Sequence, residues 1–224
     1  MGRRLFDIVV SFIALVVVAP LLGLVAVGIR LASPGPSVYR ARRVGRNGKL
    51  FTMYKLRTMH TQSGAFASTI TATNDPRVFP FGALLRRYKI DELPQLFNIL
   101  TGDMSFVGPR PEDPSIIQHH YASAHLETLE VVPGLVSPGS IYNYTHGEHF
   151  LDGEDPEAAY VKHLLSVKLA LDTVYVWEAS FAYNLRLICR ALWVIGCMVV
   201  GRRHFPDPPE MERAHRLMQP AKSA

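Results

Sequence analysis

The longest apolar run of the 224-residue chain lies near its N-terminus, where no charged side chain occurs from Ile8 through Ile29. A helix over this range is roughly 33 Å long, enough to cross the hydrocarbon core of a bilayer. The run is too long for the apolar part of a signal peptide, and no small-residue cleavage site follows it. Pro20 lies near its middle, where it removes a backbone hydrogen bond and predicts a kink.

Arginines flank this run on both sides, and they bear on its topology. Arg3 and Arg4 precede it, whereas Arg30 and a cluster between positions 40 and 46 follow it. Because positive charge favours the cytoplasmic side, both ends are drawn to the same face of the membrane. A re-entrant helix that enters one leaflet, breaks at Pro20 and returns satisfies both flanks. A kinked helix that spans the bilayer fits the length equally well.

A β-hairpin is predicted after this segment. Val38–Val44 and Lys49–Leu56 flank an Asn-Gly pair at positions 47–48, which is a strong turn signal. Lys55 and Arg57 are two residues apart, so both are expected on one face of the second strand. Two cations on one face could clamp a diphosphate, while an ordinary solvated strand face is the alternative.

A helix is predicted after the adjacent carboxylates Asp91 and Glu92. Pro94 falls in its first turn, where a missing N–H costs little, and Gly102 is suited to its C-terminal end. Both acids then lie at the helix N-terminus, and helix-capping acids are the plain interpretation. The apolar spacing i, i+3, i+4, i+7 predicts one buried stripe. Its members are Leu93, Leu96, Phe97 and Leu100.

Two more helices are predicted towards the C-terminus. The first covers Tyr160–Val176, and the second is the apolar stretch Phe181–Val200, which carries Arg186 and Arg190 one turn apart. A second membrane span would bury both arginines at a cost of several kcal/mol. An interfacial helix with its arginines at the lipid head groups costs less and is therefore preferred. The Pro-rich tail after Arg202 is expected to be poorly ordered.

The composition narrows the classes of partner. The net charge of +5 and the pI of about 9.3 favour anionic partners such as lipid head groups and phosphates. A basic run interleaved with aromatic residues is missing, so nucleic acid is not expected. Cys189 and Cys197 are the only cysteines and both lie in one apolar segment, which makes no disulfide framework.

The surroundings of Asp91 and Glu92 change the capping interpretation. Arg86 precedes the pair, and Arg110 follows it between two prolines, which hold its backbone stiff. Together with the two strand cations, these arginines suit a site where phosphates bind and a carboxylate attacks. A glycosidase would need its two carboxylates to flank a bond at about 5–10 Å, which sequence neighbours rarely do. A non-catalytic membrane adaptor on the same scaffold is the other alternative.

Four ordered motifs resemble the monotopic phosphoglycosyl transferases, bacterial enzymes that load the first sugar phosphate onto a polyprenyl phosphate. The resemblance runs from about Arg4 to Val200 and is densest between Tyr54 and Glu112. One departure is Ala19, which precedes Pro20 where the family frequently has Ser. The motifs are Tyr54-Lys55-Leu56-Arg57-Thr58-Met59, Asp75-Pro76-Arg77, Asp91-Glu92-Leu93-Pro94-Gln95-Leu96-Phe97-Asn98 and Val107-Gly108-Pro109-Arg110-Pro111-Glu112.

The resemblance implies a mixed α/β fold that is mainly helical. It comprises a re-entrant membrane helix broken at Pro20 (1–32), a catalytic domain with a small β-hairpin and interfacial amphipathic helices (33–202), and the C-terminal tail (203–224). It also implies a place at the cytoplasmic face of the bacterial plasma membrane, in contact with membrane lipids.

The implied reaction moves a phosphosugar from a nucleotide diphosphate sugar, usually a UDP-sugar, to polyprenyl phosphate and releases UMP. By the family pattern Asp91 is the nucleophile and forms a covalent phosphosugar intermediate. Glu92 assists as a Mg²⁺ ligand or base, and Asp91 and Glu92 together form the implied metal site. The phosphates are held by Lys55, Arg57, Arg86 and Arg110. Asp172 and Glu112 are candidates for the sugar or nucleotide pocket, with a surface acid as the alternative for Asp172.

Overall fold

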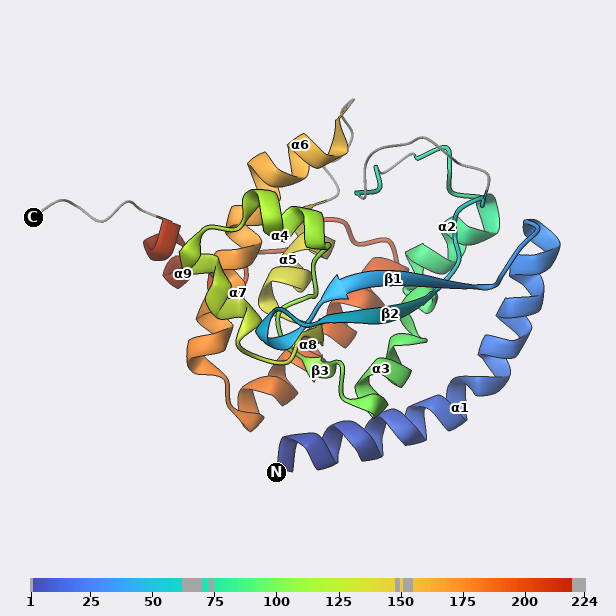
Figure 1. Ribbon diagram of the computed structural model, residues 1–224, viewed down its shortest axis with the longest axis horizontal. Helices are drawn as coiled ribbons and strands as arrows, with labels where there is room; N and C mark the ends of the chain where they lie inside the picture. Colours follow the sequence, from blue (N-terminus) through green and yellow to red (C-terminus); the bar gives the residue numbers. More distant parts are fainter. Residues whose placement is uncertain (1, 62–69, 73–74, 148–149, 151–154, 219–224) are drawn as a thin grey trace, which may run out of the picture.

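The computed structural model describes all residues except 1, 62–69, 73–74, 148–149, 151–154 and 219–224. The described chain is mainly helical and has two small sheets (Figure 1). The N-terminal half contains α1 (Gly2–Ala32), β1 (Val38–Val44), β2 (Leu50–Leu56), α2 (Pro80–Arg87), α3 (Gln95–Thr101) and β3 (Ser105–Val107). It is followed by α4 (Pro114–His120), β4 (Gly134–Val136), α5 (Pro138–His146), α6 (Pro156–Tyr160), α7 (Ser166–Glu178), α8 (Phe181–Val199) and α9 (Met211–Met218).

The predicted apolar helix is α1, which continues through Pro20 without interruption and changes direction along its length (Figure 1). Both of its ends contact the rest of the chain. Near its start, Arg4 donates hydrogen bonds to the carbonyl oxygens of Ile99 and Leu100 in α3, at 2.5 and 2.7 Å. Near its end, Ile29 is fully buried in a cluster that includes residues of β2 and α2. The middle of α1 leaves large apolar side chains exposed.

The predicted hairpin is confirmed by the antiparallel pairing of β1 with β2, in which Tyr39 lies opposite Lys55. Asn47 and Gly48 have φ angles of 57° and 76°, the left-handed conformation that tight hairpin turns require. The hairpin packs on α3, because the Asn98 side chain bonds to the β2 backbone. It accepts from the Tyr54 N–H at 3.0 Å and donates to the Thr52 carbonyl at 2.7 Å.

The helix after the carboxylate pair differs from the prediction in its start and in its buried face. α3 begins at Gln95, and Asp91 and Glu92 lie in a separate 3₁₀ turn, Ile90–Glu92. Phe97 is 48% exposed, whereas Gln95 and Asn98 are fully buried. The predicted apolar stripe is therefore wrong at Phe97, since the bonds of Asn98 to β2 turn a polar face inward. The predicted C-terminal glycine is confirmed by the left-handed φ of 99° at Gly102.

A short parallel sheet of β3 and β4 connects the two halves of the domain. Its strands approach so closely that a Cβ on Gly134 would lie 2.1 Å from the backbone nitrogen of Gly108. The sheet packs on α5, α7 and α8 around Tyr175, which is fully buried. This sheet fixes the start of the loop that carries Arg110.

The C-terminal segment corrects the expectation of a loosely ordered tail. After the predicted helices α7 and α8, the chain returns and α9 packs on α7, where Met211 and Ala214 are buried. Glu210 is buried as well and accepts hydrogen bonds from Arg190 at 2.9 Å and from Tyr183 at 2.6 Å. One face of α8 is buried in the core, so Arg190 meets a protein carboxylate where the sequence suggested lipid head groups.

Candidate active site

Four separate segments meet at Glu92. They are β2 with Lys55, the 3₁₀ turn with Asp91 and Glu92, the loop after β3 with Arg110, and α5 with Tyr144. The structure thus brings together three of the predicted groups that lie far apart in the sequence. Tyr144 is an addition that the sequence did not predict.

Glu92 is held by a two-pronged contact with Arg110. The two guanidinium nitrogens Nη2 and Nη1 donate to its two carboxylate oxygens at 2.5 and 3.1 Å. Lys55 lies 3.6 Å from the same carboxylate, and the Tyr144 hydroxyl donates to it at 3.3 Å. Burial alone would raise the pKa of Glu92, but Arg110 and Lys55 outweigh burial and hold it below its usual range. Glu92 is therefore a stable anion and a weak proton acceptor.

Asp91 differs from its neighbour in how its carboxylate is paired and in the direction of its pKa shift. Its residue is 7% exposed, and its Oδ1 atom is buried without a hydrogen-bond partner among the described residues. Burial raises the pKa of Asp91, and the nearby Glu92 anion raises it further. A carboxylate with little solvation and no bonded partner on one oxygen is a reactive one, because less stabilisation is lost when it attacks.

The cations predicted to hold phosphate lie at different depths. Burial lowers the pKa of Lys55 to about 8, although Glu92 and Asp91 favour its charged form. Arg86 donates to the Thr58 hydroxyl at 2.8 Å, and Asp91 and Asp75 favour its charged form against the effect of burial. Both cations therefore act on Asp91 through their charge.

Arg110 owes its position to the small parallel sheet. Gly108 follows β3, and its N–H donates to the Val136 carbonyl of β4 at 2.8 Å. The carbonyl of Pro109 accepts from Gly134 N–H at 2.9 Å, so the loop is tied to β4 on both sides. With prolines before and after it, Arg110 has few alternative backbone conformations. Its guanidinium is therefore aimed at Glu92 by the tertiary pairing of strands.

Lys89 and Tyr144 are the members of the site that the sequence analysis missed. Lys89 has a left-handed backbone with a φ of 56°, uncommon for a residue other than glycine. Its ammonium lies 3.9 Å from the centroid of the Tyr144 ring. The position of Lys89 two residues before Asp91 could have indicated that it belongs to the site. Nothing in the sequence around Tyr144 indicated its role.

Arg57 does not join this group, contrary to the prediction that it shares a face with Lys55. β2 ends at Leu56, and the Arg57 guanidinium turns to the segment that leaves α1. It donates to the carbonyl oxygens of Ser33 and Pro36, each at 2.6 Å, and to the Ser33 hydroxyl at 2.7 Å. Its position is that of a structural link between α1 and the hairpin.

Glu112 and Asp172, the two candidate pocket residues, are both buried. Glu112 forms an ion pair with Lys168 and accepts a hydrogen bond from the Tyr160 hydroxyl. Asp172 is 1% exposed, so the surface-acid alternative is wrong, and its carboxylate accepts from Gly139 N–H at 2.9 Å. Burial raises the pKa of Asp172 to about 6.

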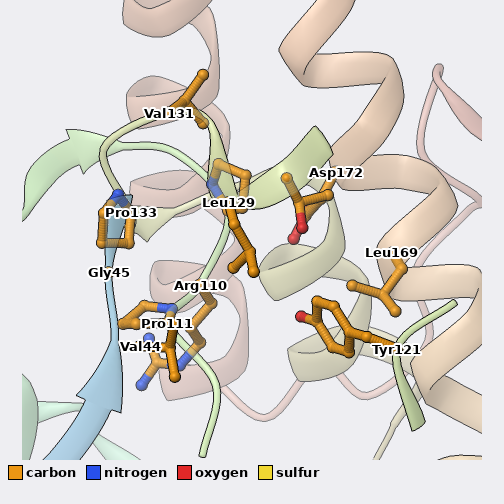
Figure 2. Close-up of a pocket in the computed structure, with 12 residues that line it drawn as sticks. Val44, Gly45, Arg110, Pro111, Tyr121, Leu129, Val131, Pro133, Leu169 and Asp172 are labelled. Atoms are coloured by element: carbon orange, nitrogen blue, oxygen red, sulfur yellow. The ribbon is translucent and has the colours of Figure 1, made fainter. Parts of the chain in front are cut away.

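One small cavity has Asp172 and Arg110 in its lining (Figure 2). The Tyr121 hydroxyl and the Asp172 carboxylate point into it, and prolines and aliphatic side chains form most of the remaining wall (Figure 2). The cavity is therefore bounded by the loop of Arg110 and by α7.

The fold thus combines a cluster of cations and buried carboxylates with long apolar helices. The structure contains two helices long and apolar enough to cross a membrane within its described residues, α1 and α8. The chain belongs to the bacterial sugar transferase family, whose model matches residues 1–197.

Several curated relatives are named as undecaprenyl-phosphate sugar phosphotransferases. A UDP-glucose:undecaprenyl-phosphate glucose-1-phosphate transferase of Escherichia coli (strain K12) is 43% identical over 187 residues, 83% of this chain and 38% of the relative. The protein of the same name from Caulobacter vibrioides is 33% identical over 194 residues, 85% of this chain and 68% of the relative. An undecaprenyl-phosphate galactose phosphotransferase of Salmonella typhimurium is 40% identical over 124 residues, 49% of this chain and 26% of the relative. The chain spans between 28% and 63% of the length of four relatives, the Escherichia coli protein among them.

Proposed function

We propose that the protein transfers a phosphosugar from a UDP-sugar to polyprenyl phosphate, with undecaprenyl phosphate as the acceptor. The products are UMP and a polyprenyl diphosphate sugar, which is the first membrane-bound intermediate of polysaccharide or glycoconjugate assembly. The observation that supports this most is the buried, unpaired oxygen of Asp91 beside Glu92, within the field of Lys55 and Arg86. The names of the relatives support the same substrates.

In the first half-reaction the Asp91 carboxylate attacks the phosphorus that carries the sugar. A bond forms between a carboxylate oxygen and this phosphorus, the bond to the bridging oxygen of the diphosphate breaks, and UMP leaves with that electron pair. Lys55 and Arg86 offset the charge that develops on the phosphate oxygens. Arg110 holds Glu92 in place and adds positive charge on the same side.

In the second half-reaction a phosphate oxygen of polyprenyl phosphate attacks the same phosphorus. The bond to Asp91 breaks, and its electron pair returns to the carboxylate, which is thereby regenerated. Because the acceptor phosphate is already ionised at neutral pH, this step needs no strong base. The low pKa of Glu92 fits that requirement and favours an anchoring role over a role as base.

Mg²⁺ is the cofactor we propose, held by Asp91 with Glu92 beside it. The described residues contain no group of three or more His, Cys, Asp or Glu that could cage a metal. Mg²⁺ commonly binds one or two carboxylates together with substrate phosphates, and the adjacent carboxylates of Asp91 and Glu92 fit this pattern. When bound, Mg²⁺ would neutralise part of the diphosphate charge.

We further propose that α1 is a re-entrant membrane helix. Its N-terminal Arg4 and its C-terminal Ile29 both pack on the same domain, which supports a topology with both ends on one side of the bilayer. A straight span would separate them by the full membrane thickness. The exposed apolar side chains between them would face lipid and bring the site to the acceptor. The cationic flanks support the cytoplasmic side.

The reaction is tested with the full-length chain in lipid nanodiscs. UMP release is measured with Mg²⁺, undecaprenyl phosphate and a panel of UDP-sugars, and the intact mass is measured without the acceptor. We expect UMP with at least one sugar, a phosphosugar adduct on the wild type, and neither with Asp91→Asn. Asp103→Asn is the matched control, because Asp103 is an exposed acid after α3. UMP release by Asp91→Asn at the wild-type rate would refute the nucleophile.

The topology is tested by cysteine labelling in a background in which Cys189 and Cys197 are replaced. Single cysteines near Arg4 and near Arg43 should react with an impermeant reagent from the same side of sealed vesicles. Labelling from opposite sides would show that α1 spans the bilayer.

A further inference from the structure

A polar stripe runs along the buried face of the segment that begins with Asp91. The 3₁₀ turn, Leu93, Pro94 and α3 follow one another in right-handed helical conformation, with φ and ψ of −55° and −33° at Leu93 and −61° and −18° at Pro94. Backbone hydrogen bonds between Lys89 and Phe97 join residues three apart, so the segment is tightly wound, and Asp91 and the residues four and seven positions after it all turn inward. The two later residues are Gln95 and Asn98, both fully buried.

Gln95 and Asn98 differ in how their amides are satisfied. Asn98 uses both its oxygen and its nitrogen in bonds to the backbone of β2. Neither Oε1 nor Nε2 of Gln95 has a hydrogen-bond partner within the described part of the chain. A buried amide without partners is destabilising, and an apolar side chain of the same size would fill the space at lower cost. We therefore expect the amide of Gln95 to find its hydrogen-bond partner during the reaction.

The candidate nearest in the chain is the unpaired Oδ1 of Asp91, four residues before Gln95. Four residues of a tightly wound 3₁₀ segment rise about 8 Å, a gap that an aspartate and an extended glutamine side chain can close with one hydrogen bond. One group is an acceptor without a donor, and the other contains a donor without an acceptor. Oδ1 shares its carboxyl group with the oxygen that the proposed reaction loads and unloads.

We propose that Gln95 is a positioning residue of the second half-reaction, in which its Nε2–H group donates a hydrogen bond to Oδ1 of Asp91. As the bond between Asp91 and phosphorus breaks, the returning electron pair spreads over both carboxylate oxygens. A donor held at Oδ1 stabilises this charge and so makes Asp91 a better leaving group. In the first half-reaction the same bond brings little gain, because it also stabilises the attacking carboxylate. The assignment rests on the proposed phosphosugar transfer.

The matched pair of variants is Gln95→Met and Asn98→Met, two amides on the same face changed to one apolar side chain. Loading of phosphosugar is followed by UMP release without acceptor, and discharge by loss of the adduct mass after undecaprenyl phosphate is added. For Gln95→Met we expect loading within about threefold of wild type, discharge slowed at least about tenfold, and an unchanged or higher Tm. For Asn98→Met we expect a lower Tm, because its two bonds to β2 are lost.

Two results would overturn the role of Gln95. The first is discharge by Gln95→Met at the wild-type rate. The second is a Tm that falls as far as in Asn98→Met while loading and discharge decline together, which would indicate a structural amide. If the wild-type chain forms no adduct with any UDP-sugar, the proposed function fails and the Gln95 assignment fails with it. Loading with normal discharge removes the Gln95 assignment alone.

Discussion

Two clusters of similar chemistry lie on either side of one loop, and they have different properties. Arg110 enters the first cluster with Glu92, Lys55 and Tyr144, while Glu112, two residues later, enters the second with Lys168 and Tyr160. Each contains a carboxylate, at least one cation and a phenolic hydroxyl.

The two clusters differ in how fully their charged groups are buried and paired; we call the second cluster closed and the first open. In the second cluster the Lys168 and Glu112 side chains are 5% and 11% exposed, and the lysine, the acid and the Tyr160 hydroxyl bond to one another. In the first cluster the Lys55 side chain is 24% exposed, and the adjacent Asp91 has an unpaired oxygen. A closed cluster holds the loop in place, whereas an open one has charge left to bind a ligand. The same residue types thus provide structure on one side of Pro111 and chemistry on the other.

The largest expected effect is on stability, through the closed cluster. Lys168→Met leaves Glu112 buried without its cation, which typically costs about 3–5 kcal/mol. The free energy of unfolding is measured by denaturant titration in detergent, followed by tryptophan fluorescence. Arg110→Met is the comparison, because Glu92 keeps Lys55 and Tyr144, and we expect a smaller loss of about 1.5–3 kcal/mol, as for hydrogen bonds to a charged group. Equal losses in the two variants would contradict the contrast between the clusters.

A substitution in the open cluster should lower the activity of the protein more than its stability. Arg110→Lys keeps the charge but loses the two-pronged contact with Glu92, since an ammonium cannot present two parallel donors. We expect kcat/KM for UMP release to fall about 100-fold, equivalent to about 2.7 kcal/mol, with little change in Tm. Arg43→Lys, a change of the same kind outside the site, provides the control. A large drop in Tm for Arg110→Lys would instead assign this arginine to the fold.

The two lysines should respond to pH with opposite signs. The folded pKa of Lys55 is lowered to about 8 by burial, so between pH 8 and about 10.5 the unfolded chain binds more protons than the folded one. Stability from this group therefore rises with pH across that window. Lys168 has a raised pKa, and its contribution is present below pH 10.5 and is lost as the pH rises through its folded pKa.

The measurement is the pH dependence of the unfolding free energy of wild type against Lys55→Met and Lys168→Met. The rise between pH 8 and 10.5 should disappear in Lys55→Met and persist in Lys168→Met. In the free enzyme kcat/KM should also decline above about pH 8 as Lys55 loses its charge. Lys55→Arg should shift this decline in kcat/KM to higher pH. A decline that keeps its position in Lys55→Arg would show that another group is responsible.

The smallest effect is expected at Tyr144, and Tyr160 provides the comparison from the other cluster. Tyr144→Phe removes one donor to Glu92, which keeps Arg110 and Lys55, so we expect a loss of about 0.5 kcal/mol or less in stability. Tyr160→Phe removes a donor to the closed Glu112, and we expect a loss of about 1.5–3 kcal/mol, as for bonds to buried charges. Thermal unfolding of both variants under one condition ranks them, and the reverse order would contradict the assignment of open and closed clusters.

Local patterns in the sequence were sufficient for several elements. The charge-free run predicted α1, the Asn-Gly pair predicted the hairpin, and Gly102 predicted the end of α3. The carboxylate pair and its cations predicted the contact of Glu92 with Lys55 and Arg110 only in outline, because nothing local specified their distance. These successes share a cause, since each depends on backbone preferences or on chain neighbours.

Tertiary structure decided the remaining features through bonds between distant parts of the chain. Asn98 reaches the β2 backbone, which turned a polar face of α3 inward and exposed Phe97. Arg57 is drawn away from Lys55 by the carbonyls after α1, and Glu210 orders the segment that composition marked as a tail.

The sequence by itself therefore determined which residues carry the charges and where helices and turns begin, because those properties are local. The fold alone decided which of two neighbouring acids is anchored and which has an unpaired oxygen. Arg110 comes to Glu92 through the pairing of β3 with β4, and Tyr144 comes to it on α5. Asp91 is left between them with its charge poorly compensated, and this property arises from burial and partners that no short stretch of sequence contains.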